Sequence, residues 1–152
     1  WIKPICTSSH GIIYKTNWTF ALRDHSSGTA RVALEHTFSG DNLQAWTNSR
    51  HASTNQWIHI VITYDNSSVS NVPIIYIDGS AVTVHANHSN LNGTLTPTGT
   101  RTSDSGNNII IGKDSQYYTE GLIDEIKIYN RILTAAEAKK NWKHGKAKHK
   151  NS

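Results

Sequence analysis

The sequence has 152 residues, 36% of them hydrophobic and 17% charged, so one domain with a single core is expected. No run of about 18 apolar residues occurs, which excludes a membrane-spanning helix, and the single cysteine, Cys6, excludes an intrachain disulfide. The net charge of +4 comes from the C-terminal end, where residues 139–152 hold six lysines and no acid. We expect residues 145–152 to form a basic, flexible tail. Nucleic-acid binding is not expected, since it needs clustered charge on an ordered face.

Apolar and polar residues alternate along most of the chain, which is typical of β-strands with one buried face. Residues 56–65 are apolar at most positions of both faces, so we expect a central strand there. Residues 72–84 contain two strand-like runs around Asp78-Gly79, a pair that tolerates the positive φ angles of a tight hairpin turn. Further strands are predicted over residues 18–23, 31–38, 42–49, 108–112 and 121–130, the last two of them buried.

One helix is predicted near the C-terminal end. Thr134 and Glu137 have the Thr-x-x-Glu spacing of a capping box, and the lysines that follow suit the negative end of the helix dipole. Trp142 is expected to hold this helix against the sheets. Residues 85–107, by contrast, show no periodicity, and loops of that length in a compact domain are usually functional or disordered.

Five stretches stand in a familiar order: WIKP at 1–4, QWIHIVITYD at 56–65, YIDG at 76–79, IIIG at 109–112 and GLIDEIKIYNRILTAAEAKKNW at 121–142. Together they resemble the laminin-G-like jelly roll of the concanavalin A-like lectin/glucanase superfamily, over nearly the whole chain and most weakly over residues 5–55. The resemblance implies an all-β, concanavalin A-like jelly-roll β-sandwich of two antiparallel sheets with one short C-terminal helix, covering residues 1–144.

In that family a strand-bearing segment usually precedes the Trp-x-Lys-Pro element, whereas this sequence begins on that tryptophan and contains no methionine. We therefore expect a processed product, an excised domain or a fragment that lacks an N-terminal segment, which would expose a sheet edge. Residues that match the family or the helix signal are expected to be structural: Trp57, His59, Asp78, Gly79, Asp124, Thr134 and Glu137.

Asp124 and Glu125 are adjacent acids in an apolar run and invite a glycosidase interpretation. Glucanases of the superfamily carry their acids as Glu-x-Asp-x-x-Glu, because residues two apart on a strand face the same way. Adjacent residues on a strand point to opposite faces, and no Glu-x-Asp occurs in this sequence. We therefore expect no enzymatic activity, with Asp124 facing the core as an anchor for loop amides and Glu125 on a polar face.

Metal ligands do not stand out in the sequence. His85 and His88 lie in the irregular segment without a metal-binding template, so no metal site is assigned. Calcium takes carboxylate oxygens from loops, and four aspartates have loop-like contexts: Asp24, Asp41, Asp104 and Asp114. No spacing selects a set among them, so no cofactor is required and calcium stays an open alternative.

Aromatic residues carry the functional hypothesis. A sugar is held by a flat ring with amides or charges beside it, and the strand at 42–49 places Gln44, Trp46 and Asn48 on one outer face. Tyr117 and Tyr118 lie in a loop that could approach Trp46, and Glu125 could touch a ligand from its polar face.

The role expected from these residues is a non-catalytic, lectin-like carbohydrate-binding module of a larger extracellular or cell-surface protein. Its partners would be a glycan or glycoprotein and the other domains of the parent protein, with no nucleic acid and no membrane insertion. Two alternatives stay open at this point: an adhesion or protein-interaction domain, and a truncated glycanase.

Overall fold

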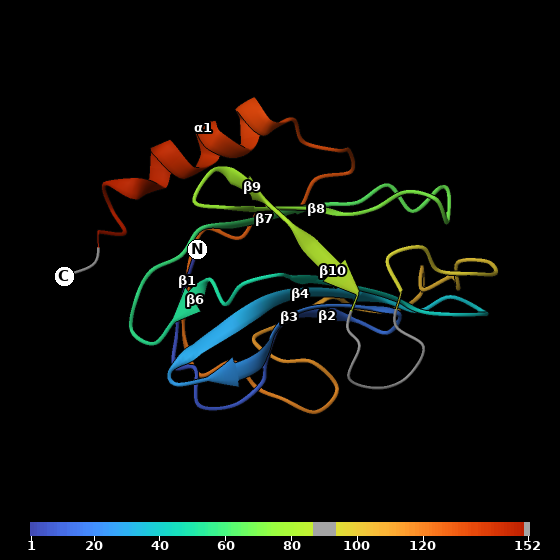
Figure 1. Ribbon diagram of the computed structural model, residues 1–152, viewed down its shortest axis with the longest axis horizontal. Coiled ribbons are helices and arrows are strands. Elements are labelled where there is room, and N and C mark those ends of the chain that lie inside the picture. Colours follow the sequence, from blue (N-terminus) through green and yellow to red (C-terminus); the bar gives the residue numbers. More distant parts are fainter. Residues whose placement is uncertain (87–93, 151–152) are drawn as a thin grey trace.

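The structure is a computed structural model that describes residues 1–86 and 94–150. It is a sandwich of antiparallel sheets with one helix outside it (Figure 1). The larger sheet has the strand order β10-β5-β4-β3-β2-β11, and β6 pairs with β4. Its strands are β2 (His10–Lys15), β3 (Trp18–Ser26), β4 (Thr29–His36), β5 (Leu43–Thr47), β6 (Ala52–Ser53), β10 (Val84–Ala86) and β11 (Ile110–Ile111).

The second layer has two ladders. One contains β7 (Ile60–Thr63), β8 (Ile74–Ile77) and β9 (Ser80–Val82), and the other pairs β1 (Ile2–Pro4) with β12 (Gly121–Ile123). Ile2 connects the two, because it pairs with Ile123 of β12 on one side and forms an antiparallel bridge with Ile58, just before β7, on the other. The prediction of an all-β sandwich with a short C-terminal helix is confirmed.

The hydrophobic core lies between the two layers. Strand alternation turns Leu22 and Val32, which are opposite each other on β3 and β4, toward Ile75 and Ile77 of β8. These residues are almost completely buried, so the period of two in the sequence does predict which face of the larger sheet is covered.

The predicted hairpin turn joins β8 to β9. Asp78 and Gly79 have φ angles of 49° and 77°, the left-handed pair that a two-residue hairpin turn requires. The Asp78 carboxylate also accepts a hydrogen bond of 2.9 Å from the backbone amide of His59. Asp78 therefore links the turn to the start of the neighbouring strand.

The helix α1 (Ala135–Lys146) begins at the predicted capping box. The hydroxyl of Thr134 accepts a hydrogen bond from the backbone amide of Glu137, and the Glu137 carboxylate accepts one from the amide of Thr134. Arg131 pairs with the same carboxylate at 2.6 Å. Trp142 lies against the hairpin turn: a Cβ added at Gly79 would be 3.2 Å from the Trp142 ring. The helix therefore covers β9, as Figure 1 shows.

Replacing Thr134 with alanine is expected to lower the free energy of unfolding by about 1 kcal/mol, the usual effect of removing an N-cap side chain. The measurement is chemical denaturation followed by tryptophan fluorescence. The matched control is Thr7→Ala, which removes an exposed threonine outside the helix. An unchanged unfolding midpoint for Thr134→Ala would show that tertiary packing alone holds the helix.

The C-terminal residues are placed differently from the flexible tail expected over 145–152. Gly145 is buried against the indole of Trp1, and the His149 ring, which is 5% exposed, stacks on Trp1 with 4.4 Å between ring centroids. Its Nε2 is 3.0 Å from the Asp124 carboxylate. The chain therefore packs on the domain as far as His149, and residues 151–152 lie outside the described part of the chain.

Two predicted strands are shorter and more exposed than expected. Over 108–112 only Ile110–Ile111 form a strand, β11, which pairs with β2 at the margin of the larger sheet and is not buried. Over 121–130 the strand ends at Ile123, and Glu125 has a φ angle of +52°. A non-glycine residue in the left-handed region does not continue a strand, so the expectation of a buried strand through Asn130 is wrong.

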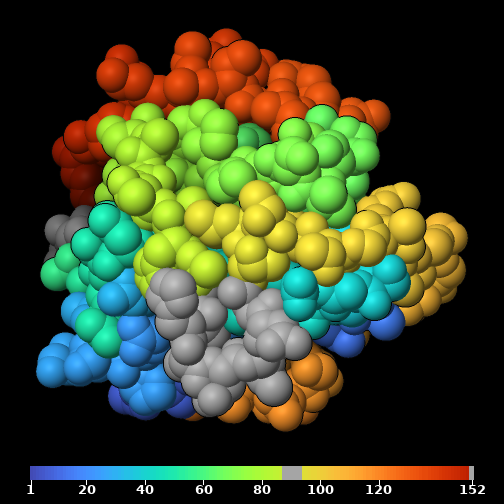
Figure 2. All heavy atoms as spheres, turned by 45° about the vertical axis from the view of Figure 1, so that its right-hand side comes forward, coloured from blue at the N-terminus to red at the C-terminus, as the bar shows by residue number. Residues whose placement is uncertain are grey.

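The described part of the long irregular segment lies along one side of the sandwich. Residues 94–101 follow the turn at 38–42: Ser39 and Gly40 donate backbone hydrogen bonds to the carbonyls of Thr100 and Thr98. Figure 2 shows this segment in yellow as a band across the molecule. Within the residues that the structure describes, no helix has the length and apolar character needed to cross a bilayer.

Candidate functional site on the outer face of the larger sheet

The floor of the outer face of the larger sheet, opposite the core, is a row of three very small residues that ends at Trp46. Gly11, Ala21, Ala33 and Trp46 stand opposite one another on β2, β3, β4 and β5. Both alanines are completely buried, although no strand of the second layer lies on this side. In Figure 1 the segment from β11 to β12, drawn in orange, runs beneath this face. Small side chains leave room above the floor for groups that come from the neighbouring strands and from that segment.

A charged group occupies this space. The Arg23 guanidinium is 3.2 Å from the Glu35 carboxylate and 2.8 Å from the Asp114 carboxylate, and the Tyr117 ring lies 5.6 Å from it, within cation–π range. Burial opposes the charge on Arg23, but Glu35 and Asp114 outweigh it and raise the pKa of Arg23. The arginine is therefore a permanently charged centre for this face.

Asp114 is held in place by its own loop. Its Oδ1 accepts hydrogen bonds from the backbone amides of Gln116 and Tyr117, at 2.8 and 2.7 Å. Burial raises the pKa of Asp114, but these amides and Arg23 outweigh burial and lower it overall. The carboxylate is thus ionised at neutral pH and fixes both the loop and the arginine, a positioning role that the sequence alone did not reveal.

Among the residues that the structure describes, three buried polar atoms on this face have no hydrogen-bond partner. They are Nη1 of Arg23, Oε1 of Gln44 and Nε1 of Trp46. Gln44 stands opposite Glu35 and Trp46 opposite Ala33 on the adjacent strand β4, and Arg23 pairs with Glu35. The three residues therefore lie at neighbouring positions of one face and offer two donors and one acceptor. Buried polar groups in proteins are nearly always paired, and unpaired ones grouped on one face suit a polar ligand. We call Arg23, Glu35, Gln44, Trp46, Asp114 and Tyr117 the outer-face cluster.

A family comparison agrees with this architecture. The model of the concanavalin A-like lectin/glucanases superfamily matches residues 1–139. The chain belongs to this superfamily. Comparisons with curated proteins and with solved structures returned no match. Membership establishes the laminin-G-like sandwich, and the ligand of this superfamily member has to be argued from its own side chains.

Of the predicted sugar-binding residues of this superfamily member, Gln44 and Trp46 lie on the outer face of β5, and Tyr117 lies against Arg23 of the same cluster. Trp46 is on the outer face as expected but only 9% exposed, so it is a wall of the patch and not an open platform. Asn48 follows the last residue of β5 and donates its backbone amide to Thr83. Tyr118 is 69% exposed under the ammonium group of Lys113.

Glu125 is not part of the outer-face cluster. It lies near the C-terminal residues, with its carboxylate 3.7 Å from the Lys148 ammonium, which also pairs with Asp124 at 2.7 Å. The expectation that Asp124 and Glu125 point to opposite faces of a strand is therefore wrong, because the strand ends before them and both reach the same lysine. The expectation that Asp124 faces the core is also wrong, since its side chain is partly exposed.

Asp124 nevertheless holds segments together, with different donors from those expected. Lys148 and His149 donate to its carboxylate along with the backbone amide of Glu125, in place of amides from a neighbouring loop. The hydrogen bonds from Lys148 and His149 lower the pKa of Asp124 to about 2. The carboxylate thus stays charged at neutral pH and fastens residues 148–149 to the end of β12.

His59 and Trp57 pack around the same C-terminal residues. The His59 ring is 5.0 Å from the Trp1 ring, and the Trp57 ring meets the edge of His149 at 4.6 Å. Burial, together with nearby positive charge, lowers the pKa of His59 to about 4. His59 is therefore neutral at physiological pH and belongs to the packing of this end of the sandwich.

The four aspartates considered for calcium do not converge. Among residues 1–86 and 94–150 no group of three His, Cys, Asp or Glu side chains could hold a metal ion. Asp24 pairs with Arg31 and Arg50, and Asp104 lies 3.4 Å from Lys15. Asp41 accepts a hydrogen bond from Thr98, and Asp114 belongs to the outer-face cluster.

Of the two histidines considered as metal ligands, His85 is on β10 beside Trp46, and His88 lies outside the described residues.

Sequence reasoning missed Arg23, Glu35 and the placement of Asp114. A signal was present in the strands. Arg23 and Glu35 are polar residues on the outward faces of β3 and β4, and the outward residues two positions before them, Ala21 and Ala33, are small. Alanine at an outward position of a strand is poorly suited to solvent and indicates that something packs above it. Asp114, 91 positions from Arg23, could not be placed there by any local pattern.

Proposed function

We propose that this chain is a non-catalytic carbohydrate-binding module and that the outer-face cluster is its sugar site. The observation that carries the proposal is the group of unpaired buried atoms on Arg23, Gln44 and Trp46. A sugar hydroxyl can donate to one group and accept from another, so neighbouring hydroxyls can satisfy both donors and the acceptor. The Tyr117 ring beside Arg23 supplies an apolar surface for the C–H face of a pyranose.

Binding requires the ligand to reach atoms that are shielded from water. Tyr117 covers the arginine but is itself exposed and comes from a loop, so it is the side chain whose displacement opens the patch. Leaving the three polar atoms unpaired disfavours the free state by an amount that a matching ligand recovers. This arrangement favours specificity for hydroxyl positions over general affinity for apolar surfaces.

Asp114 of the cluster and Asp124 at the end of β12 are not suited to act as the proton-donating acid of a glycosidase. A glycosidase acid needs a raised pKa so that it carries a proton at the working pH. The pKa of Asp114 is lowered by loop amides and Arg23 despite its burial, and that of Asp124 is lowered to about 2 by Lys148 and His149. Neither carboxyl would be protonated at neutral pH, which supports a non-catalytic role for this chain.

Replacing Gln44 with alanine is expected to weaken sugar binding at least about tenfold, because a hydroxyl loses its acceptor in a desolvated patch. The measurement is a glycan array followed by titration calorimetry with the best glycan. The matched control is Tyr118→Ala, which removes an exposed ring outside the cluster and should leave affinity unchanged. Absence of binding to every glycan would refute the proposal, as would equal effects of the two substitutions.

The proposed setting is extracellular or at a cell surface, where a glycan or glycoprotein would be the partner and other domains of a parent protein would carry further activity. A protein-interaction role is the second candidate. It rests on a separate observation, the groove between the layers of the sandwich.

A further inference from the structure

The stretch after α1 is fastened to the sandwich by one buried ring, that of His149. The residue is 5% exposed. Its ring stacks on the Trp1 indole with 4.4 Å between centroids and 11° between planes, and the Trp57 ring meets it edge-on at 4.6 Å. A ring enclosed in this way has little access to water, so its two nitrogens depend on partners within the protein.

Both ring nitrogens of His149 face oxygen atoms that can only accept hydrogen bonds. Nδ1 is 2.9 Å from the carbonyl oxygen of Gly145, and Nε2 is 3.0 Å from the carboxylate of Asp124. That carboxylate is ionised, because hydrogen bonds from Lys148 and His149 lower the pKa of Asp124 to about 2. A neutral imidazole carries one N–H and can make only one of the two bonds, whereas an imidazolium makes both. The geometry therefore matches the protonated ring.

The groups in direct contact with the ring also favour a positive charge. The face of the Trp1 indole attracts cations, and the Asp124 carboxylate is a hydrogen-bonded counter-charge. Burial opposes the charge, and so does the Lys148 ammonium, which lies 2.7 Å from the same carboxylate. Glu125, 3.7 Å from that ammonium, offsets part of its charge. The two acids thus balance Lys148 and the imidazolium.

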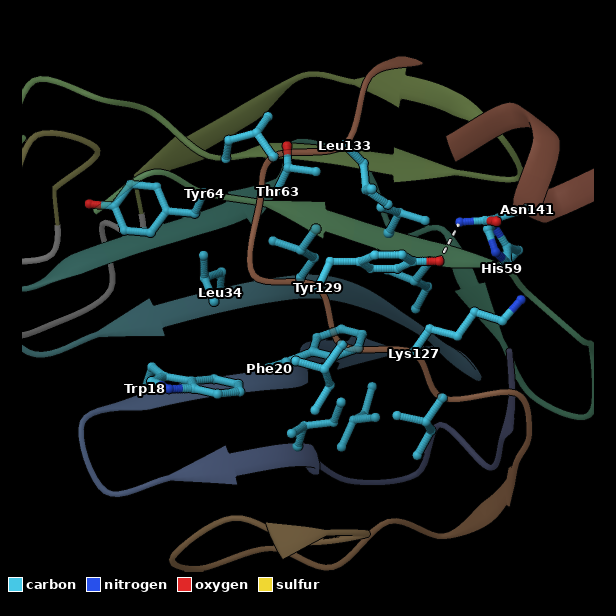
Figure 3. Close-up of a pocket in the computed structure, with 18 of the residues that line it drawn as sticks. Trp18, Phe20, Leu34, His59, Thr63, Tyr64, Lys127, Tyr129, Leu133 and Asn141 are labelled. Carbon is cyan, nitrogen blue, oxygen red and sulfur yellow. Dashed lines mark hydrogen bonds between the residues drawn. The ribbon is translucent and has the colours of Figure 1, made fainter. Parts of the chain in front are cut away.

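Further basic groups face this end of the sandwich from the second layer. His59 and Lys127 line the groove of about 640 Å³ between the layers (Figure 3). Burial and nearby positive charge lower the pKa of His59 to about 4, so this ring adds no charge above about pH 5. The Trp1 amino group donates to the carbonyl of Asp124 at 2.9 Å, and burial lowers its pKa. It therefore also loses a proton as pH rises, and any test has to separate it from His149.

We propose that His149 is a pH-sensitive latch, whose protonated ring holds residues 147–149 on the sandwich and whose deprotonation releases them. The docked state keeps a proton that the released state gives up more readily, so docking weakens as pH rises through the histidine range. Asp124 stays ionised down to about pH 4, so mild acid leaves the latch closed. Release uncovers the indoles of Trp1 and Trp57 beside two acids, and the domain then presents a different surface.

Aromatic packing alone would hold the segment at every pH, so the two explanations differ in a measurable way. A neutral ring at position 149 could still stack on Trp1. One of its nitrogens would then face an oxygen with no proton between them, and an unpaired polar atom in a buried site carries a free-energy cost. Loss of a hydrogen bond between charged groups is enough to change a population about tenfold.

The test follows docking by NMR at about pH 5.5 and about pH 8.5, on either side of the histidine range. Cross-peaks between carbon-bound ring protons of His149 and Trp1 report the docked state. Long-range proton–nitrogen spectra of the ring distinguish the imidazolium from both neutral tautomers. We expect an imidazolium with strong cross-peaks at the lower pH. At the higher pH the ratio of docked to released chain should fall at least about tenfold.

Two substitutions at position 149 separate the latch from the Trp1 amino group. His149→Arg keeps a planar cation that can stack on Trp1 and bond Asp124, so it should stay docked at both pH values. His149→Gln cannot become a cation and should be released at both. Cross-peaks from the Trp1 ring to the side chain at position 149 report docking in each. The matched control, His144→Gln, removes an exposed histidine of α1 and should switch as the wild type does.

The proposal is overturned if the wild type is docked equally at both pH values, or if the docked ring of His149 is a neutral tautomer at about pH 5.5. It is also overturned if His149→Arg is released at both pH values, which would show that a cation does not close the latch. A pH dependence that persists in either variant at position 149 would assign the switch to the Trp1 amino group.

Discussion

Replacing Gly11 with alanine is expected to destabilise the protein by about 3 kcal/mol, the upper part of the range for overpacking a close contact. An added Cβ would be 2.1 Å from the backbone nitrogen of Asp114 and 2.6 Å from the carbonyl carbon of Lys113. Both atoms belong to backbone, so no side chain can rotate to relieve the clash. β2 and the loop after β11 would have to separate, and Asp114 would then move away from Arg23.

Chemical denaturation monitored by tryptophan fluorescence measures the effect. The control is Gly106→Ala, because a Cβ at Gly106 has no neighbour within 4 Å, and its effect should be within about 0.5 kcal/mol. If the proposed sugar site is correct, Gly11→Ala should also lose glycan binding under conditions where it is still folded. Equal stability of the two variants would contradict the close packing of Asp114 on β2.

Acidification through the histidine range is expected to reduce stability by about 2 kcal/mol, with His59 as the main contributor. Burial, the Trp1 amino group and Lys127 lower the pKa of His59 from 6.5 to about 4, against the opposing charge of Glu125. Between these two values the unfolded chain binds a proton that the folded chain does not, so the free energy of unfolding falls as pH falls. The expected loss of about 2 kcal/mol is smaller than the full change in the His59 pKa implies, because water partly screens the ring.

Acidification should also lower the free energy of unfolding through His36 and His51, since burial lowers the pKa of each. The paired carboxylates affect stability only at lower pH. Hydrogen bonds lower the pKa of Asp124 and of Glu137 to about 2, so the stability that these carboxylates contribute is present above about pH 4 and is lost below it. Loss of stability between about pH 6.5 and pH 4 therefore reports histidines and not acids.

Denaturation midpoints at several pH values, measured for the wild type and for His59→Gln, test this expectation. The variant lacks the titrating ring and should have a flatter profile between about pH 6.5 and pH 4. His25→Gln removes an exposed histidine and should keep the slope of the wild type. A slope that is identical in all three proteins would assign the acid sensitivity to other groups.

Local features were predictable because their physical causes lie within a few residues. The capping box joins Thr134 to Glu137, three positions further along the chain, and the turn at Asp78 and Gly79 needs only two adjacent left-handed residues. The alternation along β3, β4 and β5 identified the core face and placed Gln44 and Trp46 together on the other face. These elements follow from propensity and side-chain parity.

The remaining features depend on contacts that no local pattern records. The stretch 124–130 has a strand-like sequence, but a strand needs a partner edge, and within the described residues only Gly121–Ile123 have one. The lysine-rich end looked like a solvated tail because its charges dominate the composition. His149 is nevertheless buried there, through one stacking contact with Trp1 and one bond to Asp124.

By itself, therefore, the sequence determined the class of fold, the helix with its cap, the hairpin turn and the two faces of the central strands. Each of these depends on short-range geometry that residue type controls directly. Only the tertiary structure decided that Asp114 reaches Arg23, that the Tyr117 ring lies against Arg23 and that Asp124 and Glu125 meet the same lysine. These contacts join residues far apart in the chain. Their geometry is set by how the loops close over the sheets, which depends on the packing of the whole domain.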